Sequence, residues 1–340
     1  MNYHNTLLAG LTAILILTGM VYSNPNKGKH KPVLKQVASI DLPGPAGRRF
    51  DYLTIDYTHN YLLSAHLEAD VSYVIDLRTN KIVKMIEGTP GVEGIEYAPN
   101  LNKAYTSNWN DQSIGVIDMS RLKVVKRIPA ISKPDGNTYA AAFRKLYVSD
   151  ERAKTLLVVD ASRDTVINQI SFRSETGMPQ YDSITRKVYL NLQDENLFVV
   201  IDPVTDKILG SYPIGQCRGN HGMALDEIHH LAFLVCGQND LLTVMNLTDY
   251  KPVAFIKIPS GADVVKYDPG LRRIYVACYS GVISVIEETD PLHFKKLQDF
   301  KVEKRVHSLA VDKVTHKVYA PAEEENGIPV SKMLVFEAIP

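Results

Sequence analysis

One pattern of about forty-two residues recurs seven times between residue 33 and the end of this 340-residue chain. A single aligned position falls in the first strand of each copy, at Ile55, Tyr97, Tyr139, Tyr181, Leu225, Tyr267 and Val311. Successive spacings are 42, 42, 42, 44, 42 and 44 residues. Self-similarity at this period predicts a repeat architecture in which each copy is one supersecondary unit.

Each copy contains four short segments rich in Val, Ile and Tyr, bounded by Asp, Asn, Gly or Pro, as β-strands are. The second segment reads KAYTS, KLYVS, KVYLN, RIYVA or KVYAP, and the third ends in phrases such as YVID, GVID and VVID. No helical periodicity is present past residue 30. The chain is therefore predicted to be all-β, a seven-bladed β-propeller with four-stranded blades.

The two ends of the repeat region predict how the ring closes. The last copy stops after KMLVFEAIP, which is its third strand, so it lacks a fourth. Residues 33–42, VLKQVASIDL, have the pattern of that missing strand. We expect the N-terminal strand to complete the last blade, because a closed ring leaves no unpaired edge.

The first segment does not belong to the repeat. Residues 7–22 are almost all apolar, but the run is too short and wrongly flanked for a transmembrane helix. The sequence predicts a signal peptide over 1–23, a linker over 24–32 and the propeller over 33–340. The mature protein is then periplasmic or secreted, with no transmembrane segment; an uncleaved anchor is the alternative.

The Lys-x-Tyr-Val strand followed by Val-Ile-Asp resembles the YVTN-type β-propeller repeat family, most clearly at residues 146–149 (LYVS) and 274–277 (IYVA). The resemblance covers residues 33–340 and implies an exported bacterial propeller. Proteins with this repeat include binding modules, surface-layer components and lactonase-like or metal-containing enzymes, so the fold does not decide among functions.

One column of the repeat carries the most chemistry, four residues before the aligned position. It is predicted to ring the channel mouth on the face where the first strands begin, called here the top face, and it contains Asp51, Glu93, Asp135, Gly177, His221, Asp263 and His307. Two imidazoles with carboxylates form a recurring ligand set for iron or zinc, and imidazole also suits copper. We therefore predict a divalent metal or copper ion held by His221, Asp263, His307 and Asp51.

Glu93 and Asp135 are then further ligands, or the general base of a lyase or lactonase-like enzyme acting on a small carboxylated or sugar-derived substrate. The structural alternative is that each polar residue in the column only caps an inter-blade loop. The sequence leaves open whether the protein is an enzyme.

Further residues of the top face are candidates for holding a small molecule, glycan or peptide. Arg49, Arg218 and Arg305, together with Lys133, could form a basic collar for an anionic ligand. Trp109 and Tyr279 could stack on a sugar or aromatic ring. Glu323–Glu325 are expected to be a solvated loop, and His229-His230 a surface turn on the opposite face.

Three cysteines, Cys217, Cys236 and Cys278, leave at least one thiol without a disulfide. Cys236 and Cys278 occupy equivalent places in adjacent blades, where they could bind a soft metal, stay as packed thiols or, least favoured, pair with each other. Cys217 could join either.

The charge balance limits the classes of partner that the sequence predicts. Lys plus Arg equals Asp plus Glu at 38 each, which gives no bulk attraction to nucleic acid, and none is expected as a partner. The alternative function is a non-catalytic propeller that docks a peptide, glycan or protein. The sequence specifies no oligomeric state.

Overall fold

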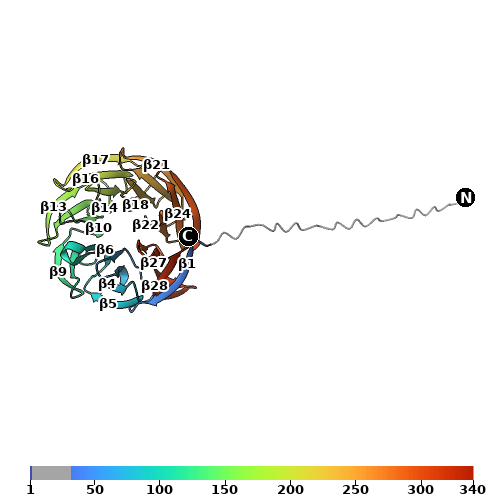
Figure 1. Ribbon diagram of the computed structural model, residues 1–340, viewed down its shortest axis with the longest axis horizontal. Coiled ribbons are helices and arrows are strands. Elements are labelled where there is room, and N and C mark those ends of the chain that lie inside the picture. The colour runs from blue at the N-terminus through green and yellow to red at the C-terminus, as the bar shows by residue number, and fades with distance from the viewer. Residues whose placement is uncertain (2–31, 340) are drawn as a thin grey trace. The chain divides into compact units, whose positions relative to one another are not determined.

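The computed structural model describes residue 1 and residues 32–339, so the predicted signal peptide and nearly all of the predicted linker lie outside the described residues. Residues 32–339 form seven four-stranded antiparallel sheets, arranged in chain order around a central channel (Figure 1). This confirms the seven-bladed β-propeller. Among the described residues, no helix is long and apolar enough to span a bilayer.

The first four blades contain strands of four to seven residues. Their bounds are β2 (Leu53–Asp56), β3 (Tyr61–His66), β4 (Val71–Asp76), β5 (Lys81–Glu87); β6 (Val92–Ala98), β7 (Lys103–Asn108), β8 (Ser113–Asp118), β9 (Lys123–Pro129); β10 (Pro134–Ala140), β11 (Lys145–Asp150), β12 (Thr155–Asp160), β13 (Thr165–Ser171); β14 (Thr176–Asp182), β15 (Lys187–Leu192), β16 (Leu197–Asp202), β17 (Lys207–Pro213). Two single-turn 3-10 helices lie in the loops, η1 (Leu67–Ala69) and η2 (Pro99–Leu101).

The last three blades vary more in strand length. Their bounds are β18 (Asn220–Asp226), β19 (Leu231–Cys236), β20 (Leu241–Asn246), β21 (Lys251–Lys257); β22 (Ala262–Asp268), β23 (Arg273–Cys278), β24 (Val282–Asp290), β25 (His293–Lys301); β26 (Ala310–Val311), β27 (Lys317–Glu325), β28 (Ile328–Ala338). β1 (Leu34–Asp41) pairs antiparallel with β28, so the N-terminal strand completes the seventh blade as predicted.

The core lies between neighbouring blades. Leu63 and Val74 of blade one pack with Val92 and Ile95 of blade two in a single buried cluster. At the closure, Leu34 of β1 belongs to one cluster with residues of blades six and seven. Alternating strands present one apolar face to each neighbour, so every blade is buried by the next one in the ring.

The Lys-x-Tyr phrase of the second strand has a structural role between blades. Lys103 and Tyr105 both reach the turn of the next blade, where Lys103 Nζ lies 2.7 Å from Asp164 Oδ2 and the Tyr105 hydroxyl donates to Asp164 Oδ1 at 2.8 Å. Lys145 and its neighbour two residues on repeat this contact with Asp206. The motif therefore stabilises the ring and carries no functional information.

Close packing of the first strands brings the residues of the channel mouth together. A Cβ atom added at Gly222 would lie 2.0 Å from the carbonyl oxygen of Asp263, and one at Gly94 would lie 2.3 Å from that of Asp135. Only glycine allows the neighbouring backbones to approach so closely. The glycine after His221 therefore seats the first strand of blade five against that of blade six.

Candidate functional site

The polar column predicted from the repeat lies at the top mouth of the channel, and most of it is buried. Asp51, Glu93, Asp135 and His307 expose 4% of their surface or less, while His221 and Asp263 are half-buried. These residues stand at, or a few residues before, the start of the first strand of their blades. Their placement on one face confirms the register, but it does not by itself show a ligand.

His221 bridges two carboxylates from other blades. Its Nδ1 lies 3.0 Å from Asp263 Oδ1 and its Nε2 lies 3.3 Å from Asp135 Oδ2. Burial disfavours the imidazolium, but hydrogen bonds to the two aspartates outweigh burial and raise the pKa of His221 well above its usual 6.5. Burial likewise opposes ionisation of both aspartates, yet His221 lowers their pKa values. The two aspartates therefore favour the imidazolium form of His221.

Arg49 occupies the space between the other two predicted metal ligands. Its Nη2 donates to Asp51 Oδ2 at 2.9 Å, and its Nε donates to His307 Nε2 at 3.3 Å. His307 Nδ1 in turn donates to the carbonyl oxygen of Arg305 at 3.3 Å. The four predicted ligands thus form two separate pairs, His221 with Asp263 and Asp51 with His307 through an arginine, rather than one cluster around an ion.

A third cation, Lys133, stands directly before β10 and lines the same cavity as Arg49 and His221. Its ammonium group contacts Glu151 directly and lies 3.7 Å from Glu93 Oε1. It also sits over the ring of Trp109, 4.6 Å from the ring centre, and Arg152 lies near the same ring at 5.7 Å. Trp109 is therefore already engaged by two cations.

Even with these cations, the mouth holds more negative charge than it can neutralise. Burial, with the charges of Asp135 and Asp51 added, raises the pKa of Glu93 to about 10. Burial raises the pKa of Asp51 to about 6, despite the adjacent Arg49. The Oε2 atom of Glu93 is buried and has no hydrogen-bond partner. Such values show carboxyl groups that are held without enough positive charge around them.

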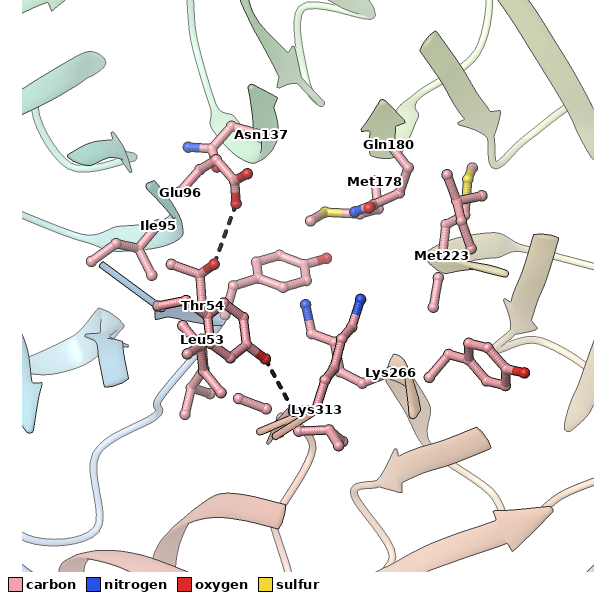
Figure 2. A pocket seen from close by; sticks show the side chains of 18 of the residues that line it. Leu53, Thr54, Ile95, Glu96, Asn137, Met178, Gln180, Met223, Lys266 and Lys313 are labelled. Carbon is pink, nitrogen blue, oxygen red and sulfur yellow. Dashed lines mark hydrogen bonds between the residues drawn. The ribbon is translucent and has the colours of Figure 1, made fainter. Parts of the chain in front are cut away.

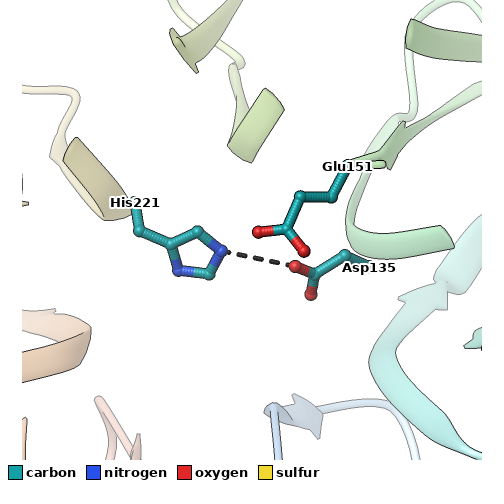
Figure 3. A group of neighbouring side chains, drawn as sticks. All are labelled: Asp135, Glu151 and His221. Carbon is teal, nitrogen blue, oxygen red and sulfur yellow. Dashed lines mark hydrogen bonds and ion pairs between the residues drawn. The ribbon is translucent and has the colours of Figure 1, made fainter. Parts of the chain in front are cut away.

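Three side chains from blades three and five do converge in the way that a metal ion requires. Asp135, Glu151 and His221 each offer one ligand atom, and these atoms all lie within 4.8 Å of one another (Figure 3). They line a cavity of about 330 Å³ together with Glu93, Lys133 and Asp263. Two carboxylates and one imidazole form a donor set that suits zinc, iron or manganese.

Glu151 is a site residue that the sequence analysis missed, because it stands one position beyond the second-strand ends. That next column contains Leu67, Trp109, Glu151, Gln193, Gly237, Tyr279 and Glu323. Glu151, Gln193 and Gly237 of this column line the cavity at the mouth, and Gln193 Nε2 donates to Glu151 Oε1 at 2.9 Å. Asp150, one residue earlier, instead accepts three backbone amides of the preceding loop and acts as a cap.

Tyr52 is a second missed residue. It is buried directly after Asp51, and its hydroxyl oxygen lies 3.3 Å from His221 Nδ1. Its backbone amide donates to the carbonyl oxygen of Glu93. The ring therefore forms part of the floor beneath the mouth. The sequence did contain a signal for this residue: Tyr52 is aromatic, whereas the other blades have small or aliphatic residues at the same repeat position.

The predicted ligand-binding residues lie on the top face but on different blades. Tyr279 follows β23 in blade six and its hydroxyl accepts from Arg305 Nε at 2.9 Å, whereas Trp109 follows β7 in blade two. Tyr279, Arg49 and His307 line a second cavity of about 310 Å³. Arg218 turns back on its own loop, donating to the carbonyl oxygen of Cys217 at 2.8 Å.

Glu323 corrects the expectation of a solvated glutamate run. It exposes only 1% of its surface, accepts from the backbone amide of Phe50 at 3.3 Å and pairs with Arg305 Nε at 3.1 Å. The longer β27, which runs through Glu325, carries it inward. The expectation was wrong because three adjacent glutamates in a strand alternate between faces and need not share one environment.

The cysteines pair in a way that repeat symmetry did not show. Cys217, in the loop before β18, forms a disulfide with Cys236 at the end of β19, with their Cα atoms 5.3 Å apart. Cys278 is a buried free thiol. The odd thiol is confirmed, and Cys236 and Cys278 do not pair with each other. The disulfide fixes the loop that leads into His221.

On the bottom face, the turn containing His229 is more organised than a surface turn. His229 Nδ1 lies 2.5 Å from Asp226 Oδ2 and 3.4 Å from Glu288 Oε1. The Tyr267 hydroxyl and Arg272 also contact these carboxylates. Asp226, His229 and Glu288 also bring three ligand atoms within 4.8 Å of one another. Unlike the group at the top, this one is already bridged by Arg272 and the Tyr267 hydroxyl.

No protein-family model matches the chain, and no curated protein matches it by sequence. Solved structures match its fold. A chain of the "Crystal Structure of Mitotic Checkpoint Complex" has a TM-score of 0.77 at 10% identity, covering 98% of this chain and 100% of that chain. The "Crystal structure of RRP9 WD40 repeats" has a TM-score of 0.76 at 9% identity, covering 89% and 99%.

A chain from "Kuenenia stuttgartiensis Hydrazine Synthase" has a TM-score of 0.71 at 14% identity, covering 83% of this chain and 94% of that chain. Likenesses at these identities show the fold alone. The chain thus shares the propeller fold of WD40-repeat proteins, and its function has to be argued from its own residues.

Proposed function

We propose that this protein is an exported propeller that binds a divalent metal ion, and with it a small ligand, at the top mouth of its channel. The observation that carries the proposal is the convergence of Asp135, Glu151 and His221, whose ligand atoms lie within 4.8 Å of one another. The buried, unpartnered Oε2 atom of Glu93 lines the same cavity and is a second, independent sign of a missing positive charge.

The electrostatics of the mouth favour a cation. Burial and neighbouring carboxylates raise the pKa of Glu93 to about 10, which is a cost that a bound divalent ion would relieve. Binding requires that the proton leave His221 and that Lys133 move off Glu151. Metal affinity should therefore rise with pH, as it does wherever ligands must first lose protons.

The residues proposed to bind the metal ion differ from those predicted from the sequence. His221 and Asp135 stay in it and Glu151 joins it, while Asp51 and His307 are held by Arg49 and are better placed to contact a bound small ligand. A bound metal ion would supply Lewis acidity toward an oxygen of that ligand. Arg49, which lines both top-face cavities, would orient a carboxylate group.

A lyase or lactonase-like activity remains a prediction within this proposal. Glu93, with its pKa near 10, is protonated at neutral pH and in this state donates rather than accepts a proton. Asp135, whose pKa its contacts with His221 lower, is the ionised member of the pair. If the mouth is catalytic, the roles of acid and base therefore divide between these two residues.

Export is part of the proposal and has support outside the N-terminal segment. A disulfide between Cys217 and Cys236 is expected in an oxidising compartment and is rare in the cytosol. The signal-peptide pattern over 1–23 points the same way. The resemblance to the YVTN-type repeat family also belongs to the proposal, and it rests on the Lys-x-Tyr-Val strands alone.

Calorimetric titration of chelator-treated mature protein with Zn²⁺, followed by thermal unfolding, tests the metal site. A ligand at one hundred times its dissociation constant stabilises the native state by about 2.7 kcal/mol. Glu151→Gln should weaken Zn²⁺ binding by about tenfold or more, since even indirect metal contacts are worth that much. Glu195→Gln, in the equivalent loop of the next blade and exposed, is the matched control and should bind normally.

Equal Zn²⁺ affinity in the wild type and in Glu151→Gln would remove the site from the proposal. So would a protein whose melting temperature does not change with Zn²⁺, Mn²⁺ or Cu²⁺, because an ion bound to the native state must stabilise it.

The second candidate is a docking platform without metal chemistry, and exposed apolar turns of the bottom face favour it. Tyr57, Ile184, Ile228 and Val314 follow first strands of four blades and expose 45%, 55%, 68% and 74% of their surface. Apolar side chains exposed on one face offer contacts to a protein partner. This candidate predicts partner binding that Ile228→Ser and Val314→Ser weaken and that Glu151→Gln leaves unchanged.

A further inference from the structure

A third cavity, of about 230 Å³, lies in the channel away from the proposed metal site (Figure 2). It is lined mainly by first-strand residues of several blades, including Leu53, Ile95, Met178, Met223 and Lys266. Tyr57, Glu227 and Lys313, which come directly after first strands, also line it. These positions are on the bottom face, because the first strands begin at the top.

Tyr52 separates this cavity from the top mouth. Its ring lines the cavity, while its hydroxyl oxygen lies 3.3 Å from His221 Nδ1 on the other side. The aspartates, Glu93 and Glu151 of the mouth do not line the lower cavity. The two spaces therefore have different linings and have to be assigned separately.

Two lysines from adjacent blades point into the same part of the cavity (Figure 2). Lys266 is in the middle of β22 and half-buried, and Lys313 is in the turn after β26 and exposed. Between residues 32 and 339, neither ammonium group takes part in an ion pair or a hydrogen bond. Elsewhere in the ring Lys103, Lys133 and Lys145 all pair with carboxylates.

This arrangement disfavours the charged form of Lys266. Burial lowers the pKa of Lys266, and the like charge of Lys313 adds to the shift. Glu96 offsets it only in part, because its carboxylate is beyond ion-pair distance. The two ammonium groups thus lie near each other without a direct ion-pair partner, in contrast to the paired cations at the top.

Glu96 sets how much negative charge the cavity can accept. Burial raises the pKa of Glu96 to about 7, although Lys266 and a hydrogen bond from Thr54 Oγ1, at 3.5 Å, lower it. Glu227 also lines the cavity. With two lysines and two glutamates in the lining, one of them easily protonated, a single added negative charge balances the site.

We propose that this lower cavity is a binding site for a small monocarboxylate, whose carboxylate group lies between Lys266 and Lys313. The side chains of Met178 and Met223 form an apolar wall for a short aliphatic chain. A phosphate dianion fits less well, because its second charge would face Glu96 and Glu227. The inference does not depend on the metal site at the top.

Methyl NMR of methionine-labelled protein tests the proposal with sodium propionate as the probe. The methyl signals of Met178 and Met223 should shift and saturate, while those of Met85 and Met119, which are not in the cavity lining, stay in place. Lys266→Gln and Lys313→Gln should each weaken propionate binding by about tenfold, the worth of one charge-assisted hydrogen bond. Lys313 is exposed, so its variant should fold even if Lys266→Gln does not.

Sodium chloride at equal ionic strength and Lys207→Gln, on the outer strand β17, are the controls. Absence of a saturable shift, or an equal shift with chloride, would overturn the site. Saturation by phosphate but not by propionate would overturn the carboxylate assignment. Retained binding in both lysine variants would show that the lysines do not hold the anion.

Discussion

At the top of the channel each cation contacts a carboxylate directly, whereas at the bottom neither of two lysines does. His221 lies between Asp135 and Asp263, Arg49 pairs with Asp51, and Lys133 pairs with Glu151. Lys266 and Lys313 share a cavity with Glu96 and Glu227, but neither lysine forms an ion pair with them.

The same seven first strands therefore form two different kinds of site. Seven first strands supply both ends of the channel, and the difference comes from which residue types stand at their starts and at their ends. An excess of carboxylate selects cations, and ammonium groups without an ion-pair partner select anions. The comparison can be tested by removing charges at each end in turn.

Removing the bridging cation at the top should have the largest effect on stability. His221→Ala leaves Asp135 and Asp263 without the imidazolium that bridges them. Since breaking a buried pair costs several kcal/mol and 18% of the His221 side chain is exposed, we expect a loss of about 3 kcal/mol. Urea unfolding at pH 7 measures it. A loss below about 1 kcal/mol would be that of a surface contact and would contradict a buried bridge.

Reducing the disulfide should loosen the top end by a similar, slightly smaller amount. Cys217 and Cys236 close a short loop, and a Cys217→Ser, Cys236→Ser double variant should lose about 3 kcal/mol or less. The sharper result concerns the site: Zn²⁺ binding should weaken, because the loop that seats His221 is released. Propionate binding at the bottom should stay unchanged, and a loss there would show that the two ends are not independent.

The protonation of His221 should shift by at least about one pKa unit, or 1.4 kcal/mol, when a carboxylate is removed. In metal-free wild-type protein, ¹⁵N-imidazole NMR should show His221 doubly protonated well above pH 6.5, and in Asp263→Asn its titration should move down. The stability that the raised pKa contributes is complete below the unfolded value and is lost as pH rises through the folded one. A His221 that titrates near 6.5 in the wild type would contradict the bridge.

Neutralising a lysine at the bottom should have the smallest effect, with the opposite sign. Lys266→Met removes a buried charge whose pKa is lowered by burial, so stability at pH 7 should stay level or rise by up to about 1 kcal/mol. Wild-type stability should increase with pH through that lowered pKa, because the unfolded lysine holds its proton longer. Urea unfolding at several pH values checks both, and a loss above about 2 kcal/mol would mean that Lys266 has a stabilising partner.

The fold could be predicted from the sequence because each of its determinants is local or periodic. The forty-two-residue spacing, the period-two strands and the unpaired last copy predicted seven blades and their closure by β1. The Lys-x-Tyr phrase marked the second strands, although its role, a contact with an aspartate of the next blade, depends on the ring itself.

The site could be predicted only in part, because partner choice depends on side-chain direction. The register found Asp135 and His221, but it could not show that Arg49 turns inward between Asp51 and His307. Glu151 was missed because the repeat column directly after the second strands was not considered, and that column also contains Gln193 and Glu323. The disulfide was missed because Cys217 lies in a loop, where repeat symmetry gives no position.

Anomalous X-ray scattering at the zinc edge from crystals grown with Zn²⁺ tests the central claim most directly. The account predicts one strong peak at the top mouth, bonded to His221 Nε2 and to carboxylate oxygens of Asp135 and Glu151, at about 2.0–2.2 Å from each. It also predicts Lys133 displaced from Glu151. A mouth without a peak, with His221 still between its two aspartates, would contradict the metal site, as would zinc bound only at Asp226, His229 and Glu288.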